Sequence, residues 1–453
     1  MKKIYAIMAL FLAGTLILVL PGQIAAWRNN ATYPVTLDNT NTDCRYPATY
    51  MVNSKEFTVW QQIDSTNGNW DIYLRWGNGV TWYPANPVRI TNTANWDNDD
   101  NDNEHPDVTA TYHEGEEGEN PEFYVYIAWQ YELPDTNPPI WEIETCRVII
   151  NANTNTVTTI GYGRASDVHA VESNSILPAI DTGDYYGEIH LVWEDYQLSG
   201  QPEIIHDKSI NGMTWRPDQF VSLSLDDGYS KDPTICVNYD SSMGVSKDTV
   251  CVIWEEYNEQ YANNPQLFIN TSQFWNQGSY PIYTHGPVII PNGQTTSSEV
   301  DPDVRYKESE FCYVWSDDRN TDWEIYYQKV YYNAVLSPTF RSLLRVTNDD
   351  DDDQHPMIDL AKNFDPQPAQ TEIHIVWDTD RNGNLDVYAC RGIKNAGGGD
   401  AISSSGQGGS DNRVSFTNDD EDYPDVNANS RYGYCVFEKD SNTPWEIKYT
   451  MDP

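Results

Sequence analysis

The most regular feature of the sequence is a short apolar, β-rich run that ends in an aromatic residue. Each run is followed by a polar loop and then by a second run of the type Trp-acid-Ile-Tyr. Runs of this length between turn residues are typical of β-strands. The first runs end at Trp60, Trp129, Trp193, Trp254, Trp315, Trp377 and Phe437, in steps of 69, 64, 61, 61, 62 and 60 residues. A nearly fixed period over seven copies indicates a repeat architecture.

Two further phrases complete each repeat. A proline phrase such as His105-Pro-Asp-Val108 precedes each copy, and a phrase such as Leu344-Arg-Val-Thr-Asn348 follows most copies. Each repeat therefore predicts four short strands, and we expect the first strand to open at its proline, where no ladder donor is needed. Four-stranded units in radial repetition predict an all-β, seven-bladed β-propeller.

The two ends of the chain are expected to close this ring. The seventh unit, residues 423–453, ends after its third strand, whereas residues 33–39 resemble the fourth-strand phrase at 87–92. We therefore expect residues 33–39 to supply the missing outer strand of the last blade. That pairing removes the open edges of a linear array and makes residues 27–453 a single propeller.

Residues 1–26 have the pattern of a secretory signal peptide. A short basic start precedes an almost wholly apolar run at 4–20, and small residues follow it. An uncleaved membrane anchor is the alternative, because 17 apolar residues reach the lower limit for a membrane span. No second apolar stretch of spanning length occurs in the sequence. We expect a secreted protein, extracellular or periplasmic, without membrane insertion after cleavage.

The repeated tryptophans are predicted to form the core between blades. Burying one Trp removes about 150–250 Å² from water, which corresponds to roughly 4–6 kcal/mol before opposing terms. Stacking against sugars is the alternative role for these rings. Because they recur at one position in six of the seven repeats, with Phe437 in the seventh, we interpret them as core residues.

The chain carries 69 Asp and Glu residues against 27 Lys and Arg residues, which gives a formal charge of −42. Such a field repels the phosphate backbone and argues against a nucleic-acid partner. The acids gather in the linkers between blades: residues 97–107, 349–353 and 419–422 hold 6, 5 and 4 of them. In a propeller these linkers share one face with the loops between second and third strands. We call it the linker face.

Clustered Asp and Asn oxygens in these linkers suit Ca²⁺, a hard cation that takes 6–8 oxygen ligands. A solvated acidic loop is the alternative interpretation. The spacing is not that of an EF-hand, because Asp102 stands where the turn glycine belongs. The candidate ligands are Asp97, Asp99, Asp100, Asp102, Asp349, Asp350, Asp351, Asp419, Asp420 and Asp422.

Other polar residues of the linker face are candidates for contacts with a protein or glycan ligand. His105 and His355 precede prolines and should lie near the mouth of the central channel. Their blades are not adjacent, which disfavours a shared transition metal. Acids that recur on the third strands are expected to be hydrogen-bond partners for loops, because a catalytic pair would not repeat by blade. The ligand-face candidates are His105, Asp317, Asp318, Arg319, His355, Asp380 and Arg381.

The sequence holds seven cysteines, and an odd number leaves at least one thiol outside any intramolecular disulfide. Cys236 and Cys251 fall on neighbouring predicted strands of the fourth blade. Because a secreted location permits disulfides, we predict a Cys236–Cys251 bridge.

Two propeller families are similar to these repeats. The phrases Arg345-Val-Thr-Asn348 and Arg381-Asn-Gly-Asn-Leu-Asp-Val-Tyr388 resemble TolB-type secreted and periplasmic propellers, and the likeness extends over the predicted propeller. Ser209-Ile-Asn-Gly-Met-Thr-Trp215 resembles the Asp-box of sialidase-like propellers, one residue short and with Asn in place of Asp. Residues 76–82 are a weaker copy. Arg45 resembles the substrate-gripping Arg of that family, and is a weak catalytic candidate.

Three functions follow from these features. The uniformity of the blades favours a non-enzymatic, secreted or cell-surface propeller that binds protein or glycan. A sialidase-like glycoside hydrolase is implied by the second resemblance, but the net charge opposes an anionic sugar. A structural subunit of a surface layer or filament is the third interpretation. The oligomeric state does not follow from the sequence.

Overall fold

The structure is a computed structural model of the 453-residue chain. It describes residues 35–38, 42–91, 101–116, 118–134, 136, 138–166, 174–182, 188–196, 201–215, 221–223, 228–240, 247–258, 264–275, 288–290, 297–333, 336–348, 350–363, 370–394, 400–402, 413–414, 419–429, 432–440 and 444–452. The predicted signal peptide, residues 1–26, lies outside these ranges. Within them, no helix is long and apolar enough to cross a membrane.

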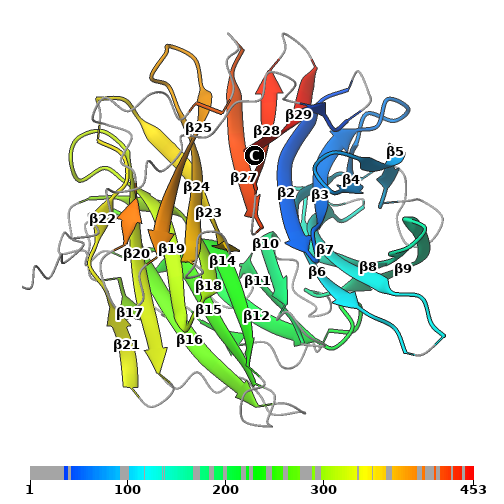
Figure 1. The fold of residues 1–453 in the computed structure, drawn as a ribbon, viewed down its shortest axis with the longest axis horizontal. Helices are drawn as coiled ribbons and strands as arrows, with labels where there is room; N and C mark the ends of the chain where they lie inside the picture. The colour runs from blue at the N-terminus through cyan, green and yellow to red at the C-terminus, as the bar shows by residue number, and fades with distance from the viewer. Residues whose placement is uncertain are drawn as a thin grey trace, which may run out of the picture.

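Seven antiparallel sheets stand side by side around a central axis, and the colours run once around the ring (Figure 1). Blade 1 contains β2 (Cys44–Val52), β3 (Lys55–Ile63), β4 (Trp70–Gly77) and β5 (Trp82–Arg89). Blade 2 contains β6 (Asn103–His113), β7 (Glu122–Glu132), β8 (Trp141–Asn151) and β9 (Thr156–Arg164). Blade 3 contains β10 (Ser175–Thr182), β11 (Ile189–Asp195), β12 (Glu203–Ser209) and β13 (Val221–Ser222).

The remaining blades continue the ring. Blade 4 contains β14 (Tyr229–Asp240), β15 (Lys247–Tyr257), β16 (Gln266–Trp275) and β17 (Val288–Ile289). Blade 5 contains β18 (Glu299–Lys307), β19 (Glu310–Asp317), β20 (Glu324–Asn333), β21 (Leu336–Phe340) and β22 (Leu344–Arg345). Blade 6 contains β23 (Asp353–Asn363), β24 (Gln370–Thr379), β25 (Asp386–Lys394) and β26 (Ala401–Ile402). Blade 7 contains β27 (Glu421–Ala428), β28 (Gly433–Asp440) and β29 (Trp445–Asp452), together with β1 (Val35–Thr36).

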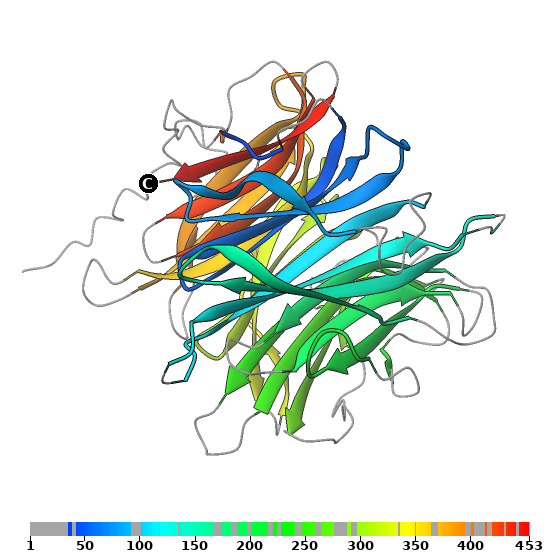
Figure 2. The ribbon, with the colours of Figure 1, turned by 90° about the vertical axis from the view of Figure 1, so that its right-hand side faces the viewer.

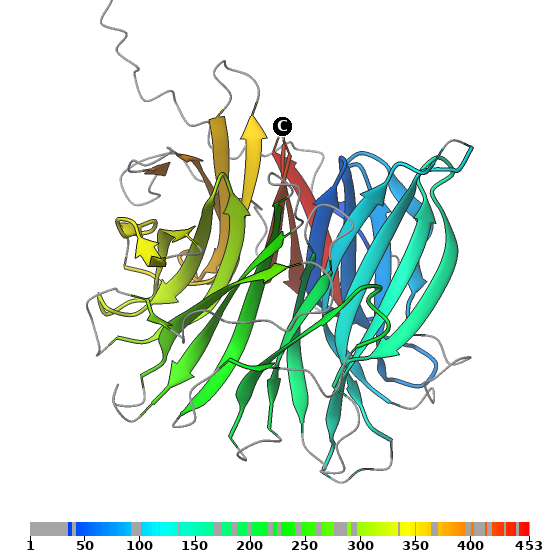
Figure 3. The same cartoon turned by 90° about the horizontal axis from the view of Figure 1, so that it is seen from below.

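The prediction of an all-β, seven-bladed propeller is confirmed. The four-strand pattern holds in part, because β21 and β22 both pair with β20 in blade 5 and several outer strands are two residues long. Figures 2 and 3 show the twist of the sheets from two further directions. This twist is expected of L-amino-acid strands.

The N-terminal segment lies on the last blade. Val35 pairs with Tyr449 and Thr36 with Lys448, so β1 adds to the outer edge of β29. The Leu37 N–H donates to the Ile447 carbonyl at 2.9 Å, and its side chain is buried in the blade 7 cluster. The predicted closure is therefore seen over the part of 33–39 that the structure describes. Figure 2 shows the short dark-blue strand beside the red strands.

The repeated tryptophans form the core, as predicted. The indoles of Trp60, Trp129, Trp193, Trp254, Trp315 and Trp377 are all fully buried. Their N–H groups donate to polar side chains of the same blade, for example from Trp129 to Asn103 at 2.8 Å. Because a buried indole N–H without a partner is costly, these bonds fix the ring in one orientation.

The first strand of each blade differs from the prediction. It begins before the proline, and each proline lies within a β-bulge, for example between Glu104 and Asp107 in β6. A bulge leaves one residue out of the ladder, so a proline is tolerated there. The residue before each proline has a positive φ between 45° and 53°.

The predicted Cys236–Cys251 disulfide is not formed in this structure, where all seven cysteines are buried free thiols. The two residues are direct cross-strand partners on β14 and β15. They pack with Leu267 and Ile269 as small apolar side chains. Burial raises the pKa of both thiols well above the usual value, which keeps them unreactive.

We predict that the ring depends on its N-terminal strand. Deleting residues 27–40 should lower the melting temperature, because it exposes the edge of β29. The finer variant Leu37→Ala should cost about 3 kcal/mol of unfolding free energy, since Leu37 is 0% exposed. Val80→Ala is the control, because Val80 is 73% exposed and should tolerate the change. Chemical denaturation measures all three; an unchanged midpoint after the deletion would refute the closure.

Candidate functional site

The seven residues that precede the repeated prolines form a ring at the linker-face mouth of the central channel. Each is half-buried and each lines one cavity of about 340 Å³. The positive φ and the following proline belong to the bulge of the first strand. In blade order the ring residues are Tyr46, His105, Leu177, Asp232, Asp301, His355 and Tyr423. We call this set the mouth ring.

Side chains of the preceding blade hold the mouth ring in place. For five of the seven ring residues the acceptor is the residue that follows the core aromatic on the second strand, whereas the Tyr423 N–H is accepted by Asp422. Gln61 accepts the His105 N–H at 2.8 Å, and Glu194 accepts the Asp232 N–H at 3.0 Å. The same bond joins Gln130 to Leu177, Glu255 to Asp301 and Glu438 to Tyr46. An N–H that the bulge removes from the ladder is thus paired across the blade seam.

Four aromatic members of the mouth ring form a continuous arc over blades 6, 7, 1 and 2. Ring centroids lie 4.6 Å apart for His355 and Tyr423, 5.0 Å for Tyr423 and Tyr46, and 4.1 Å for Tyr46 and His105. Burial lowers the pKa of His105 to about 4, so its imidazole is neutral at physiological pH. The arc separates His105 from His355, which do not share a ligand position.

His355 forms a charged cluster with two carboxylates. Its Nδ1 lies 2.8 Å from Asp378 Oδ2 and 3.6 Å from Asp422 Oδ1. Burial opposes the charge on the imidazole, but the hydrogen bonds to both acids outweigh it and raise the pKa of His355 to about 11. These three groups have the spacing of a metal site. A cationic imidazole bridging two carboxylates satisfies them without a metal, so the cluster serves as an ion bridge between blades 6 and 7.

Carboxylates also join the first strands deeper in the channel. Asp107 accepts the Ile180 N–H at 2.7 Å, and Asp425 accepts the Thr49 N–H at 2.6 Å. Asp181, Asp303 and Asp359 make the equivalent bonds at three other seams. Arg305 is the sole arginine among the residues that line the cavity, and it pairs with Asp303 at 2.9 Å. Much of the acid in the channel therefore holds blades together.

The arginines predicted to face a ligand are paired with acids and aromatic rings of their own blades. Arg319 pairs with Asp317 at 2.8 Å and lies 4.3 Å from the ring of Tyr326. Arg381 pairs with Asp353 at 3.1 Å and lies 4.6 Å from the ring of Tyr388. The remaining candidates act as turn acceptors: Asp318 receives the Ser298 N–H and Asp380 the Asp352 N–H. Of the seven ligand-face candidates, His105 and His355 reach the mouth ring.

The predicted calcium ligands do not converge within the described residues. Asp102 accepts the Trp70 N–H at 2.9 Å, and Asp420 accepts the Leu385 N–H at 3.1 Å. Asp419 pairs with Lys439 at 3.0 Å, and Asp422 belongs to the His355 cluster. Asp350 and Asp351 lie within the described residues, and Asp350 is exposed. Asp97, Asp99, Asp100 and Asp349 lie outside the described residues. The linker acids that are described clamp a linker to the third strand before it; calcium binding stays a prediction.

Arg45, the weak catalytic candidate, does not reach a group of arginines. Its guanidinium lies 3.1 Å from Glu438 and 3.7 Å from the centre of the Trp445 ring. The turn at 209–215 is held by the Asn211 side chain, which accepts the N–H groups of Met213 and Thr214. Asn78 makes the same two contacts in the weaker copy. Both turns are structural.

The acids on the third strands are hydrogen-bond partners, as predicted, and the threonines that they bind lie just after the fourth strands β5 and β22. Asp71 accepts the Thr91 hydroxyl at 2.8 Å and pairs with Arg89. Glu324 accepts the Thr347 hydroxyl at 2.6 Å. These bonds explain why acid and Thr recur at fixed places in the repeat.

Sequence reasoning missed five members of the mouth ring. The signal was present, because each stands directly before a repeated proline, but the proline phrase was interpreted as a strand start. The side chains that hold the ring were also missed, although Gln, Glu or Asp follows the core aromatic in six blades. The missed ring residues are Tyr46, Leu177, Asp232, Asp301 and Tyr423.

No protein-family model matches the sequence, and no curated protein matches it. Several solved structures are similar in fold at 10% identity. Trypanosoma rangeli sialidase in complex with sialic acid has a TM-score of 0.42, and the match covers 95% of this chain and 58% of that chain. The Penicillium chrysogenum alpha-L-arabinanase complexed with arabinobiose has a TM-score of 0.46, with 79% and 97% covered. A Dyadobacter fermentans protein of unknown function has a TM-score of 0.44, with 92% and 97% covered.

The chain thus spans somewhat more than half of the sialidase chain that it matches. At this identity and TM-score the likeness bears on neither ligand nor mechanism.

We predict that Glu194 makes stability fall as pH rises. Burial, with a contribution from Asp232, raises the pKa of Glu194 to about 7, against 4.5 in the unfolded chain. The folded state thus holds a proton that the unfolded state releases. This stabilisation is complete below pH 4.5, is lost as pH rises through 7, and amounts to at most about 3 kcal/mol.

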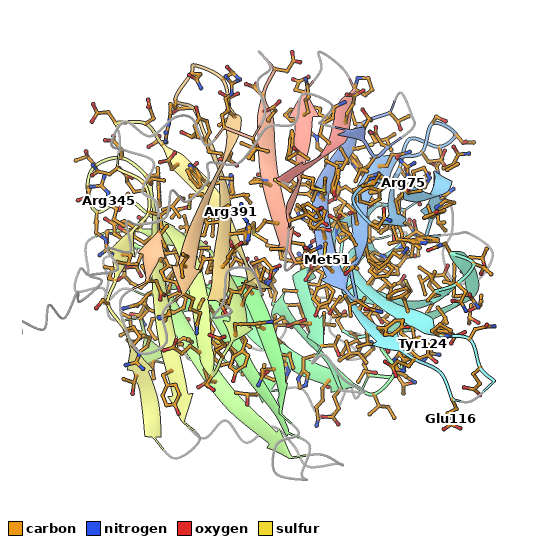
Figure 4. All side chains as sticks on the ribbon, in the orientation of Figure 1. Met51, Arg75, Glu116, Tyr124, Arg345 and Arg391 are labelled. Carbon is orange, nitrogen blue, oxygen red and sulfur yellow. The ribbon has the colours of Figure 1, made fainter. Side chains whose placement is uncertain are left out.

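Glu194→Gln tests this directly, because blades 1 and 2 carry Gln at the same position. The variant should be more stable than the unmodified chain at pH 8, and the difference should vanish at pH 4.5. Denaturation at both pH values measures it. Glu116→Gln, on an exposed loop far from the channel (Figure 4), is the control. A Glu194→Gln variant with an unchanged pH profile would show that Glu194 ionises normally.

Proposed function

We propose that the chain is a secreted or cell-surface propeller that binds a protein or glycan ligand at the mouth ring, without chemical turnover. The observation that carries this proposal is unused hydrogen-bonding capacity. Among the described residues, the hydroxyls of Tyr46 and Tyr423, the His105 imidazole and the Asp232 carboxylate have no hydrogen-bond or salt-bridge partner. All four line the same cavity.

The other repeated polar residues form hydrogen bonds that hold the strands and blades together. Linker acids accept N–H groups of third strands, channel acids join first strands, and third-strand acids accept hydroxyl groups that follow fourth strands. Four residue types, Tyr, His, Leu and Asp, occupy the seven positions of the mouth ring. A varied lining of this kind around one cavity suits recognition of an asymmetric ligand.

Binding rather than hydrolysis is supported by how the charged groups are paired. Arg45 is held by Glu438 and Trp445, away from any second arginine among the cavity-lining residues. His355 is bridged between two carboxylates, so it is a poor proton acceptor.

The test is a binding screen of the full chain on a glycan array and on immobilised extracellular proteins, followed by mouth-ring variants. Tyr46→Leu and Tyr423→Leu should each weaken binding of any ligand found by about tenfold or more, because buried Tyr contacts dominate interfaces. Leu is compatible with this backbone, since blade 3 carries Leu177 at the same position.

Tyr331→Leu is the matched control, because Tyr331 is an exposed tyrosine outside the mouth ring. A ligand whose affinity is unaffected by both ring variants would contradict the proposal. A panel of fluorogenic glycosides should show no turnover; hydrolysis of any substrate, lost in the ring variants, would show that the mouth is catalytic.

A further inference from the structure

The mouth ring is chemically polarised. The aromatic arc of His355, Tyr423, Tyr46 and His105 occupies one side, and Asp232 and Asp301 of blades 4 and 5 follow Leu177 on the other. Glu255 lies directly behind the two aspartates, where its Oε1 accepts the Asp301 N–H at 3.0 Å. Burial, together with Asp232 and Asp301, raises the pKa of Glu255 well above its usual value. The carboxyl groups on the acidic side therefore disfavour one another's charged forms, and a cation bound among them would favour those forms.

The cationic side chains near the mouth contact groups other than Asp232. Arg45 contacts Glu438, and His355 is bridged between Asp378 and Asp422. The Lys231 ammonium lies 5.5 and 5.8 Å from the ring centres of Tyr229 and Tyr257. Each of these cations has its own partner, and none forms a salt bridge with Asp232.

Asp232 is the exception among the carboxylates of the mouth. Its backbone N–H is accepted by Glu194, but its carboxylate has no hydrogen bond or salt bridge within the described residues. It is recessed in the wall of the cavity, where a neutral partner would leave its charge uncompensated. Such a group is stabilised when a cation arrives.

The aromatic arc supplies the complementary surface. Tyr and His rings attract a cation through their faces, within about 6 Å of the ring centre. The neutral His105 imidazole and the two tyrosine hydroxyls add hydrogen-bond acceptors. A cavity of about 340 Å³ accommodates a small ligand or the end of one long side chain.

We propose that the mouth ring receives an alkylammonium group, which lies over the aromatic arc and pairs with Asp232. This inference rests on the proposed function and names the chemical class of its ligand. The net charge of −42 attracts such a group from solution and repels carboxylated or sulfated ligands. The ammonium belongs either to a lysine side chain of a protein partner or to a free polyamine.

The first experiment is saturation-transfer NMR of the full chain with n-butylammonium and with n-butanol, which has the same chain length without the charge. Butylammonium should bind at least about tenfold more tightly than butanol, and its affinity should fall with added salt. Asp232→Asn should abolish this preference. Glu116→Gln removes the same charge from a distant exposed loop and should leave it intact. If Asp232→Asn and Glu116→Gln changed the preference for butylammonium equally, the binding would reflect general charge attraction, and the inference would be overturned.

Two further arms identify the source of the ammonium group. A peptide blocked at both ends and containing one lysine is compared with spermidine: tighter binding of the peptide assigns a protein partner, and tighter binding of spermidine assigns a polyamine. Acetylation of the peptide lysine should remove its binding. If n-butanol or a neutral glycan binds in a Tyr46-dependent manner and butylammonium does not, the cation inference fails while the proposed function stands. If no ligand depends on Tyr46, both fail.

Discussion

The left-handed residue before each repeated proline is the constraint on which the rest of this propeller depends. A positive φ in a residue other than glycine costs about 1–2 kcal/mol, and here it occurs seven times at one place. Each occurrence bulges the first strand, directs one side chain into the channel mouth and frees one N–H. For five ring residues that N–H is accepted by a side chain of the preceding blade, as in the contact from His105 to Gln61, whereas the Tyr423 N–H is accepted by Asp422 of its own blade. Strain within a blade is thus offset by bonds between blades.

The large acidic excess has a structural explanation in the parts of the chain described. Carboxylates accept backbone N–H groups at three levels: from linkers to third strands, at the mouth ring, and between first strands deeper in the channel. Such acceptors close the seams between sheets that share no β-ladder. Many of these groups are buried, and burial raises their pKa values, for example to about 8 for Asp425. Many of the acids therefore serve as hydrogen-bond acceptors for backbone N–H groups. The Asp232 carboxylate differs, because it accepts no hydrogen bond within the described residues.

The structural features that could be predicted from the sequence are those in which the same residue type recurs in each repeat. The blade count, the buried tryptophans and the role of acids such as Asp71 were predictable, since the same physical requirement recurs in each copy. The mouth ring was not, because Tyr, His, Leu and Asp carry no signature of a positive φ; the following proline alone marks the position. The prediction for the charged loops was wrong for a related reason. Arg319 and Arg381 are residue types typical of a ligand-binding surface, but each guanidinium already contacts an Asp carboxylate and a Tyr ring of its own blade.

The central claim is that the mouth ring is set by its left-handed backbone, and the relative stability of Leu177→Gly and Leu177→Ala tests it most directly. Both variants remove the same half-buried side chain, so their difference reports the backbone. In an ordinary strand Ala is more stable than Gly by about 0.5–1 kcal/mol. At Leu177, with φ of 51°, the account predicts the reverse order, with Gly more stable than Ala by about 1 kcal/mol in chemical denaturation. Greater stability of the Ala variant would contradict it.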